Sequence, residues 1–256
     1  MVRVQRRSII RYTAPATTHR THLSPHFHIF VRRALHIRFA CADTMIQAFE
    51  NQPFQENTYI ITDGTGDCAI IDPGMHTAHE QNAVADFIKN NRLRPAILLN
   101  THCHIDHVLG NKFIFDMYGL KPHFHANEQE VLEYAIPYAQ AAGLHYEPLH
   151  ERADYLPETG TIKVGDDTGF EILFVPGHAP GHVAFYNRKQ NYLIGGDVLF
   201  RGSIGRTDLP GGDFQQLMRS IKNELLTLPG DCTVYPGHGP STTIGHEIRT
   251  NPFLNM

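Results

Sequence analysis

The sequence lacks the features that mark disulfide-rich secreted domains and membrane proteins. Its four cysteines lie far apart and include no CxxC pair, so no disulfide framework is indicated. They are Cys41, Cys68, Cys103 and Cys232. No stretch approaches the roughly 18 consecutive apolar residues that a membrane-spanning helix requires. We therefore expect a protein without membrane contacts, in a reduced, cytoplasmic setting.

Charge of one sign is not in large excess either, since the 256 residues carry 22 Lys and Arg against 26 Asp and Glu. The formal charge of −4 argues against a dedicated nucleic-acid-binding protein. Hydrophobic residues make up 41% of the chain, which is typical of a globular protein. Histidine is the exception in this ordinary composition, with 18 residues.

Residues 1–44 differ in composition from the rest of the chain. They hold eight Arg, five His and one acidic residue, which leaves 14 basic and 25 acidic residues, a formal charge of −11, in residues 45–256. An arginine-rich, acid-poor N-terminus is typical of a transit peptide, but Pro15 and Pro25 weaken an amphipathic helix. We interpret residues 1–44 as an extension that is disordered or not part of the fold, and residues 45–256 as the folded domain.

Strand and helix patterns alternate along residues 45–256. A hairpin over 58–62 and 68–71 is followed by a helix over 78–91 and a buried strand over 94–100. Further strands are predicted at 161–164, 170–175, 183–187, 192–194 and 233–235, and further helices at 111–119, 127–142 and 214–226. Asn127, with Glu130 three residues later, is expected to cap the middle helix. This pattern predicts an α/β domain with two sheets, or one large sheet, covered by helices.

Four metal-ligand side chains occur within six residues directly after the strand at 94–100. Alternation along an extended chain places His102, His104 and Asp106 on one side, and a tightening turn brings His107 alongside Asp106. The same alternation turns Cys103 away, into packing. Imidazole nitrogen and carboxylate oxygen are ligands of divalent metals such as zinc. A histidine network without a metal is the alternative, but HxHxDH after a strand favours a metal site.

Three later strands each run into a glycine and then a ligand-type residue, namely His178, Asp197 and His238. Glycine lets the backbone turn close to a metal without a Cβ in the way. Together with the first cluster, this makes seven donors, too many for one four-coordinate ion. We expect two divalent metal ions that share a carboxylate, with zinc as the first candidate and iron or manganese as alternatives.

The motifs THCHIDH, PGHAPGH, GGD and PGHG, in this order, resemble those of the metallo-β-lactamase superfamily over about residues 45–256. The resemblance implies the αββα sandwich of that family, in which two facing sheets have helices outside. It also implies which donors hold each ion. One ion would be held by His102, His104 and His178, and the other by Asp106, His107 and His238, with Asp197 bridging the two.

Within the superfamily, the segments GDVLFRGSIGRTDLPGGD and YPGHGPSTTIGHEIRTNPFL are similar to short glyoxalase-II-like enzymes. The resemblance implies a hydrolase of small-molecule thioesters such as hydroxyacylglutathione (lactoylglutathione), which a metal-bridged hydroxide attacks. Longer glyoxalase II enzymes add a C-terminal helical domain that helps to bind glutathione, and we expect this chain to lack it. They also carry a Tyr and a Lys where this sequence has Gly239-Pro240 and Arg206.

Asp106 is the first catalytic candidate, because it can orient the attacking hydroxide or accept its proton. Five further residues around the metal centre also have expected roles. His182 is the second catalytic candidate, through a hydrogen bond to a ligand or substrate oxygen, or else a buried, satisfied histidine. Asp72 either fixes a ligand imidazole or caps a turn. Arg206 anchors an acidic substrate or forms a surface ion pair. Tyr134 and Tyr138 either line a substrate pocket or pack on the sheet.

Two other functions compete with the hydrolase. A persulfide dioxygenase with a single iron shares the HxHxDH run and a GRTD loop, but such enzymes typically have Cys where this sequence has His182. A non-catalytic metal-binding scaffold is disfavoured because all seven donors are present. A β-lactamase and a nuclease carry less weight, since there is no secretion signal and the domain is acidic. No oligomeric state is predicted.

Overall fold

The computed structural model describes residues 44–149, 151–165 and 168–255. The interpretation of residues 1–44 as an extension therefore concerns a segment that, apart from Thr44, lies outside the described residues. Among the described helices, none has both the length and the apolar character needed to span a bilayer.

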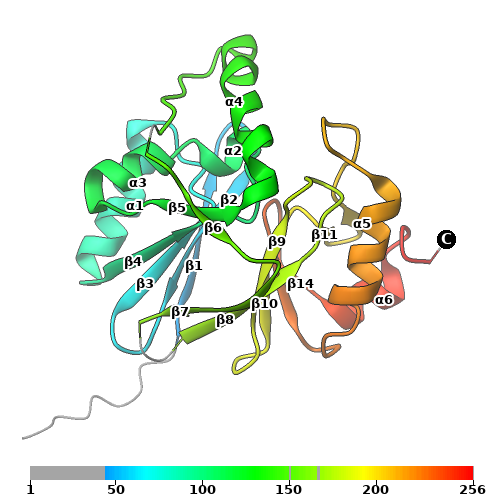
Figure 1. The fold of residues 1–256 in the computed structure, drawn as a ribbon. Coiled ribbons are helices and arrows are strands. Elements are labelled where there is room, and N and C mark those ends of the chain that lie inside the picture. Colours follow the sequence, from blue (N-terminus) through cyan, green and yellow to red (C-terminus); the bar gives the residue numbers. More distant parts are fainter. Residues whose placement is uncertain (1–43, 150, 166–167, 256) are drawn as a thin grey trace, which may run out of the picture. The chain divides into compact units, whose positions relative to one another are not determined.

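Two six-stranded sheets with helices outside them form the predicted αββα sandwich (Figure 1). The first sheet contains, in spatial order, β1 (Ile46–Asn51), β2 (Glu56–Thr62), β3 (Asp67–Ile71), β4 (Arg94–Leu99), β5 (Pro122–His125) and β6 (Asp154–Leu156). The second contains β14 (Thr242–Thr243), β13 (Thr233–Pro236), β10 (Tyr192–Gly196), β9 (Val183–Asn187), β8 (Thr168–Phe174) and β7 (Thr159–Val164). The short strands β11 (Leu199–Phe200) and β12 (Ser203–Ile204) pair separately.

Side-chain alternation along the central strands explains why the two sheets face each other. In β2, Tyr59 and Ile61 point into the layer between the sheets, where they share a core with Phe170 of β8 and Phe185 of β9. Ile60, between them in the sequence, belongs to the core under the helices. Both faces of β2 are thus covered, and all seven of its residues are buried.

Helices cover the outer faces of both sheets. α1 (Ala78–Asn90) and α3 (Asn111–Tyr118) contribute to the core outside the first sheet. α5 (Phe214–Ser220), the π-helical turn Ile221–Leu225 and α6 (Ile244–Thr250) contribute to the core outside the second. α4 (Gln129–Ala142) instead packs against the short α2 (Ile105–Val108), in a smaller apolar cluster that includes buried Cys103. The packing role predicted for Cys103 is therefore confirmed.

The structure corrects several local predictions. Asn127 does not cap α4: a 3₁₀ turn over Ala126–Glu128 comes first, and the Asn127 amide donates to the ring of His125. α4 begins only at Gln129, after Glu128, whose carboxylate accepts a hydrogen bond from the Cys103 amide in the interior instead of capping the helix. Of the remaining elements, seven had no predicted counterpart, since none exceeds seven residues and periodicity needs a longer window: β5, β6, β11, β12, β14, α2 and α6.

Candidate metal centre

The end of β4 supplies the first group of donors. After Leu99 the chain bends at Thr101 and reaches His104, which is the N-cap residue of α2 and is extended, with φ −63° and ψ 152°. The first turn of α2 then brings Asp106 and His107 toward the same place. His102 and His107 are fully buried, whereas Asp106 is only partly so. The predicted tightening turn is therefore the short helix α2.

The second sheet supplies the other three donors from separate strand ends. His178 follows β8, Asp197 follows β10 directly, and His238 follows β13. Close approach requires the glycine before the last of them, because a side chain on Gly237 would collide with the Asp197 carboxylate and the His107 ring. The structure thus brings all seven predicted donors to one edge of the sandwich.

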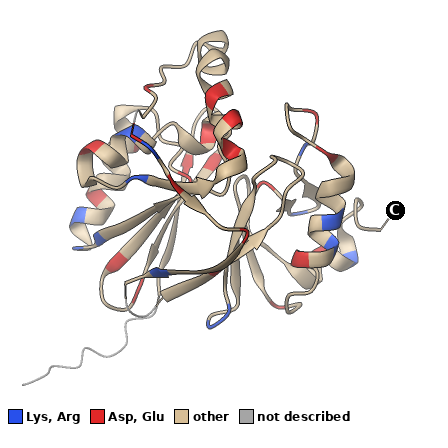
Figure 2. Ribbon diagram, in the orientation of Figure 1, with Lys and Arg blue, Asp and Glu red and all other residues tan. Residues whose placement is uncertain are grey.

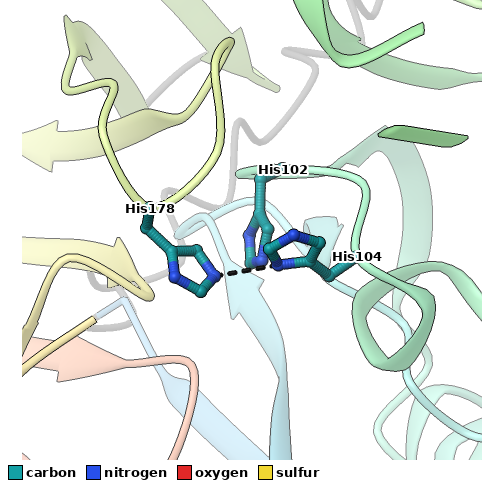
Figure 3. Close-up of side chains that lie close together, drawn as sticks. All are labelled: His102, His104 and His178. Carbon is teal, nitrogen blue, oxygen red and sulfur yellow. Dashed lines mark hydrogen bonds between the residues drawn. The ribbon is translucent and has the colours of Figure 1, made fainter. Parts of the chain in front are cut away.

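The donors fall into three triads whose ligand atoms lie within 4.8 Å of one another. One consists of His102, His107 and Asp197, and the other two, which we call the first and second triads, share no residue with each other. In the first triad, His102, His104 and His178 converge, and His104 Nδ1 lies 2.9 Å from His178 Nε2 (Figure 3). In the second, Asp106, His107 and His238 converge, and His238 Nε2 lies 3.2 Å from an Asp106 oxygen. The first and second triads coincide with the two ligand sets that the family resemblance implies.

Asp197 lies between the two triads. One carboxylate oxygen is 3.5 Å from His107 Nε2, and the other is 3.6 Å from His178 Nε2 and 3.4 Å from His238 Nε2. The nearby His107 and His238 hold the pKa of Asp197 well below its ordinary value, although burial alone would raise it. A carboxylate in this position can be shared by two cations.

The imidazoles are oriented and protonated in a way that fits divalent cations. His178 Nδ1 donates to the Arg206 carbonyl at 2.7 Å and His238 Nδ1 to the Phe54 carbonyl at 3.1 Å, so the Nε2 atom of each faces the centre. His102 Nε2 is buried without any hydrogen-bond partner. Burial and the neighbouring imidazoles also keep the pKa of His102 well below its usual value, which leaves a neutral nitrogen lone pair. An unpartnered buried nitrogen is unfavourable unless a cation binds it.

The charges of the side chains in the second triad also favour a bound divalent cation. Burial lowers the pKa of His238, but the carboxylates of Asp106 and Asp197 outweigh it and raise the value to about 10. The pKa of His107 is raised well above normal, against its own burial, by the same two carboxylates. The acidic groups therefore attract positive charge into this site, and a divalent cation would provide it in place of two protons.

Asp72 and His182 hold the donors in place. The Asp72 carboxylate accepts hydrogen bonds from the Thr101 amide and hydroxyl, both at 2.7 Å, and lies 3.1 Å from His107 Nδ1, so it fixes a donor imidazole. His182 accepts the Asp197 amide at 3.0 Å and stacks on His102, with ring centroids 4.7 Å apart. His182 is fully buried and does not line the cavity above the centre. His182 therefore contacts the donor Asp197 through the backbone amide of Asp197, and its expected catalytic role stays a prediction.

Glu128 is a residue that the sequence analysis missed. Its fully buried carboxylate accepts the Cys103 amide at 2.8 Å and the Gly181 amide at 2.6 Å. Cys103 lies between two donors of the first loop, and Gly181 follows His178 in the second. Burial raises the pKa of Glu128 to about 7. Glu128 thus connects both donor loops to the start of α4. No sequence motif marks Glu128 as a residue with this role, and only the rarity of buried carboxylates in proteins makes its position notable.

A cavity of about 630 Å³ opens above the donors. Tyr134 and Tyr138 line it, which settles the alternative left open for these two residues. Arg206 also lines it, but its guanidinium donates to both carboxylate oxygens of Asp208, at 2.7 and 2.6 Å. Both side chains of this pair are more than half exposed. Arg206 thus forms the surface ion pair that the sequence analysis gave as the alternative to anchoring a substrate. Its backbone carbonyl, not its side chain, contacts the metal donor His178.

Comparisons with known proteins agree with this architecture. The family model for the metallo-beta-lactamase superfamily matches residues 51–238. The hydroxyacylglutathione hydrolase GloC of Haemophilus influenzae is 38% identical over 203 residues, which cover 79% of this chain and 94% of that protein. The crystal structure of the BLEG-1 B3 metallo-beta-lactamase is 34% identical with a TM-score of 0.76, covering 83% of this chain and 100% of that one. The structure of TTHA1623 in a di-iron-bound form is 38% identical with a TM-score of 0.73, covering 82% and 100%.

Proposed function

Because this chain belongs to the metallo-β-lactamase superfamily, we propose that it hydrolyses thioesters with the help of two divalent metal ions. The observation that carries the proposal is the pair of donor triads on either side of Asp197, at the base of a cavity large enough for a small molecule. The similarity to a hydroxyacylglutathione hydrolase makes lactoylglutathione the first substrate to test. Zinc is the proposed metal, and the di-iron form of TTHA1623 supports iron as the alternative.

The donors divide between the ions according to the two triads. We assign His102, His104 and His178 to one ion, Asp106, His107 and His238 to the other, and Asp197 to both. When bound, such ions lower the pKa of water toward neutrality and polarise a carbonyl oxygen. Asp72, His182 and Glu128 keep the donors aligned through the hydrogen bonds described above.

Asp106 has the position and charge of the residue that orients the attacking water and accepts its proton. Its carboxylate lines the cavity, and it is held as an anion because His107 and His238 lower its pKa against the effect of burial. Attack of the water oxygen on the carbonyl carbon breaks the C–S bond and releases a carboxylic acid and a thiolate. Since a thiol has a pKa near 8.5, the leaving group requires little help from an acid.

The test combines metal analysis with turnover. The full chain, purified without added chelator, should contain two ions and hydrolyse lactoylglutathione or another member of a thioester panel. Two bound ions with no turnover of any thioester would overturn the proposal. One iron per chain, with oxygen consumed in the presence of a glutathione persulfide, would favour the dioxygenase instead.

A further inference from the structure

Above the donors, the cavity is bounded mainly by apolar and aromatic side chains. Tyr134 and Tyr138 of α4 are 60% and 50% exposed and line it one helical turn apart. Val131, on the same helix, continues this stripe, and Phe54 and Phe200 also line the cavity. Large aromatic side chains exposed beside a metal centre form a surface suited to an apolar part of a ligand.

The apolar lining reaches the donors themselves. The Phe200 ring packs edge-on against His238, with centroids 6.3 Å apart, and the Phe54 carbonyl accepts the hydrogen bond from His238 Nδ1. A carbonyl held at the donors would therefore have these two rings close by. A group attached to that carbonyl would fit against aromatic surface.

The charged side chains that line the cavity do not suit a ligand with several carboxylates. Of the described residues that line it, Arg206 is the only Lys or Arg, and Asp208 already occupies its guanidinium. α4 carries Glu130 and Glu133 and no basic residue, as Figure 2 shows. Glutathione has two carboxylates, and burying them without cationic partners is unfavourable.

We infer that this cavity selects thioesters with an uncharged aromatic or branched-alkyl acyl group, joined to a thiol that carries no carboxylate. The inference rests on the proposed thioester hydrolysis and names its substrate class. It differs from the hydroxyacylglutathione suggested by similarity in both parts of the molecule. The acyl group follows from the aromatic lining, and the thiol follows from the fact that, among the described residues lining the cavity, the one guanidinium is paired with Asp208.

Four thioesters separate these two parts. They combine the phenylacetyl or lactoyl group with N-acetylcysteamine, which is neutral, or with glutathione, and are assayed with the metal-loaded full chain. We expect kcat/KM for the phenylacetyl ester of N-acetylcysteamine to exceed that for lactoylglutathione at least about tenfold, through KM. An equal or higher value for lactoylglutathione would overturn the inference and leave thioester hydrolysis standing. No turnover of any of the four by protein with two bound ions would overturn the proposed function itself.

Variants of α4 locate the acyl site. Tyr138→Ala should raise KM for the phenylacetyl ester about 3- to 10-fold and change KM for the lactoyl ester less, because only the phenyl ring packs on Tyr138. Ile136→Ala, on the same helix but not lining this cavity, is the matched control and should leave both values unchanged.

Binding of an uncleavable thioether analogue with a phenethyl group provides a measurement independent of turnover. Calorimetry should show weaker binding by Tyr138→Ala and unchanged binding by Ile136→Ala, with both variants giving the circular dichroism spectrum of the parent. Equal loss of affinity for the phenethyl compound and its hydroxyethyl counterpart in Tyr138→Ala would overturn the assignment of the acyl group to this surface.

Discussion

The floor and the wall of the cavity are built in opposite ways. The floor is built around the seven donors, which come from the ends of strands in both sheets; five of them line the cavity, and His102 and His107 are fully buried. The wall is largely apolar and includes the exposed Tyr134 and Tyr138 of α4, a helix that packs on α2. Rigid strand ends hold the atoms that must meet with small tolerance, while a helix beside them can vary its side chains without disturbing the donors. The comparison assigns chemistry to the floor and selection to the wall.

Removing Asp197 is the strongest test of the floor. Asp197→Ala deletes the one donor that lies between both triads, so we expect kcat/KM to fall at least about 10³-fold, beyond the 10- to 100-fold typical of residues that only support ligands. Metal content, measured on the same sample, should fall as well. Asp116→Ala, on the exposed side of α3, is the control. Unchanged thioester turnover in Asp197→Ala would mean that the donors are not catalytic and would favour a scaffold.

The floor could be anticipated from the sequence because its chemistry restricts residue types and positions. His102 and Asp106 belong to a run whose spacing is typical of metal ligands, and His178, Asp197 and His238 each follow a strand and a glycine. Because each of these residues follows a predicted strand, their convergence at one edge of the sheets could be inferred before their contacts were seen. The two facing sheets followed from the family resemblance.

The wall could not be anticipated in the same way. A tyrosine on an amphipathic helix packs on a sheet or lines a cavity with the same sequence pattern, and only the placement of α4 decides between them for Tyr134 and Tyr138. The same holds for Arg206, whose partner Asp208 lies two residues away, and for Glu128, whose partners lie 25 and 53 residues distant. Contacts that depend on tertiary placement leave no periodic signal.

Glu128 connects the donor loops of the floor to α4 of the wall, and its titration makes the free energy of unfolding depend on pH. Burial raises its pKa from 4.5 to about 7, so the folded protein favours the protonated carboxyl. Its contribution to stability is therefore complete below about pH 4.5 and is lost as the pH rises through 7. Glu128→Gln removes this titration. For metal-free protein, we expect the stability of the parent relative to Glu128→Gln to decrease by on the order of 3 kcal/mol between pH 4.5 and pH 8.

Urea unfolding of both proteins across this pH range measures the difference. Glu133→Gln is the matched control, because Glu133 lies on α4 but is exposed, and its substitution should change the unfolding free energy only slightly. A difference between parent and Glu128→Gln that stays constant with pH would contradict the predicted role of the buried carboxyl.

A change far from both floor and wall should affect stability alone. Thr77 caps α1 on the outer side of the first sheet: its hydroxyl accepts the Glu80 amide, and the Glu80 carboxylate accepts the Thr77 amide. Thr77→Ala should lower the free energy of unfolding by about 1 kcal/mol. Because α1 does not line the cavity, kcat/KM should stay within about twofold of the parent. A larger loss of activity would show that the division between floor, wall and scaffold is too simple.

The smallest effect, and the one that separates floor from wall most finely, is expected from Asp208→Asn. The pKa of Asp208 is held at about 2 by Arg206, so the pair is fully ionised at neutral pH and occupies the guanidinium. Removing this negative charge frees Arg206 to bind a substrate carboxylate. The kcat/KM of a glutathione thioester should then rise about two- to fivefold relative to the N-acetylcysteamine ester with the same acyl group, since exposed ion pairs are weak. The gain should shrink in high salt and vanish in the double variant Asp208→Asn/Arg206→Gln. If the double variant keeps the gain in kcat/KM, Arg206 is not its source. If only the single variant shows the gain, Arg206 and Asp208 set the preference for the thiol, and the metal donors play no part in it.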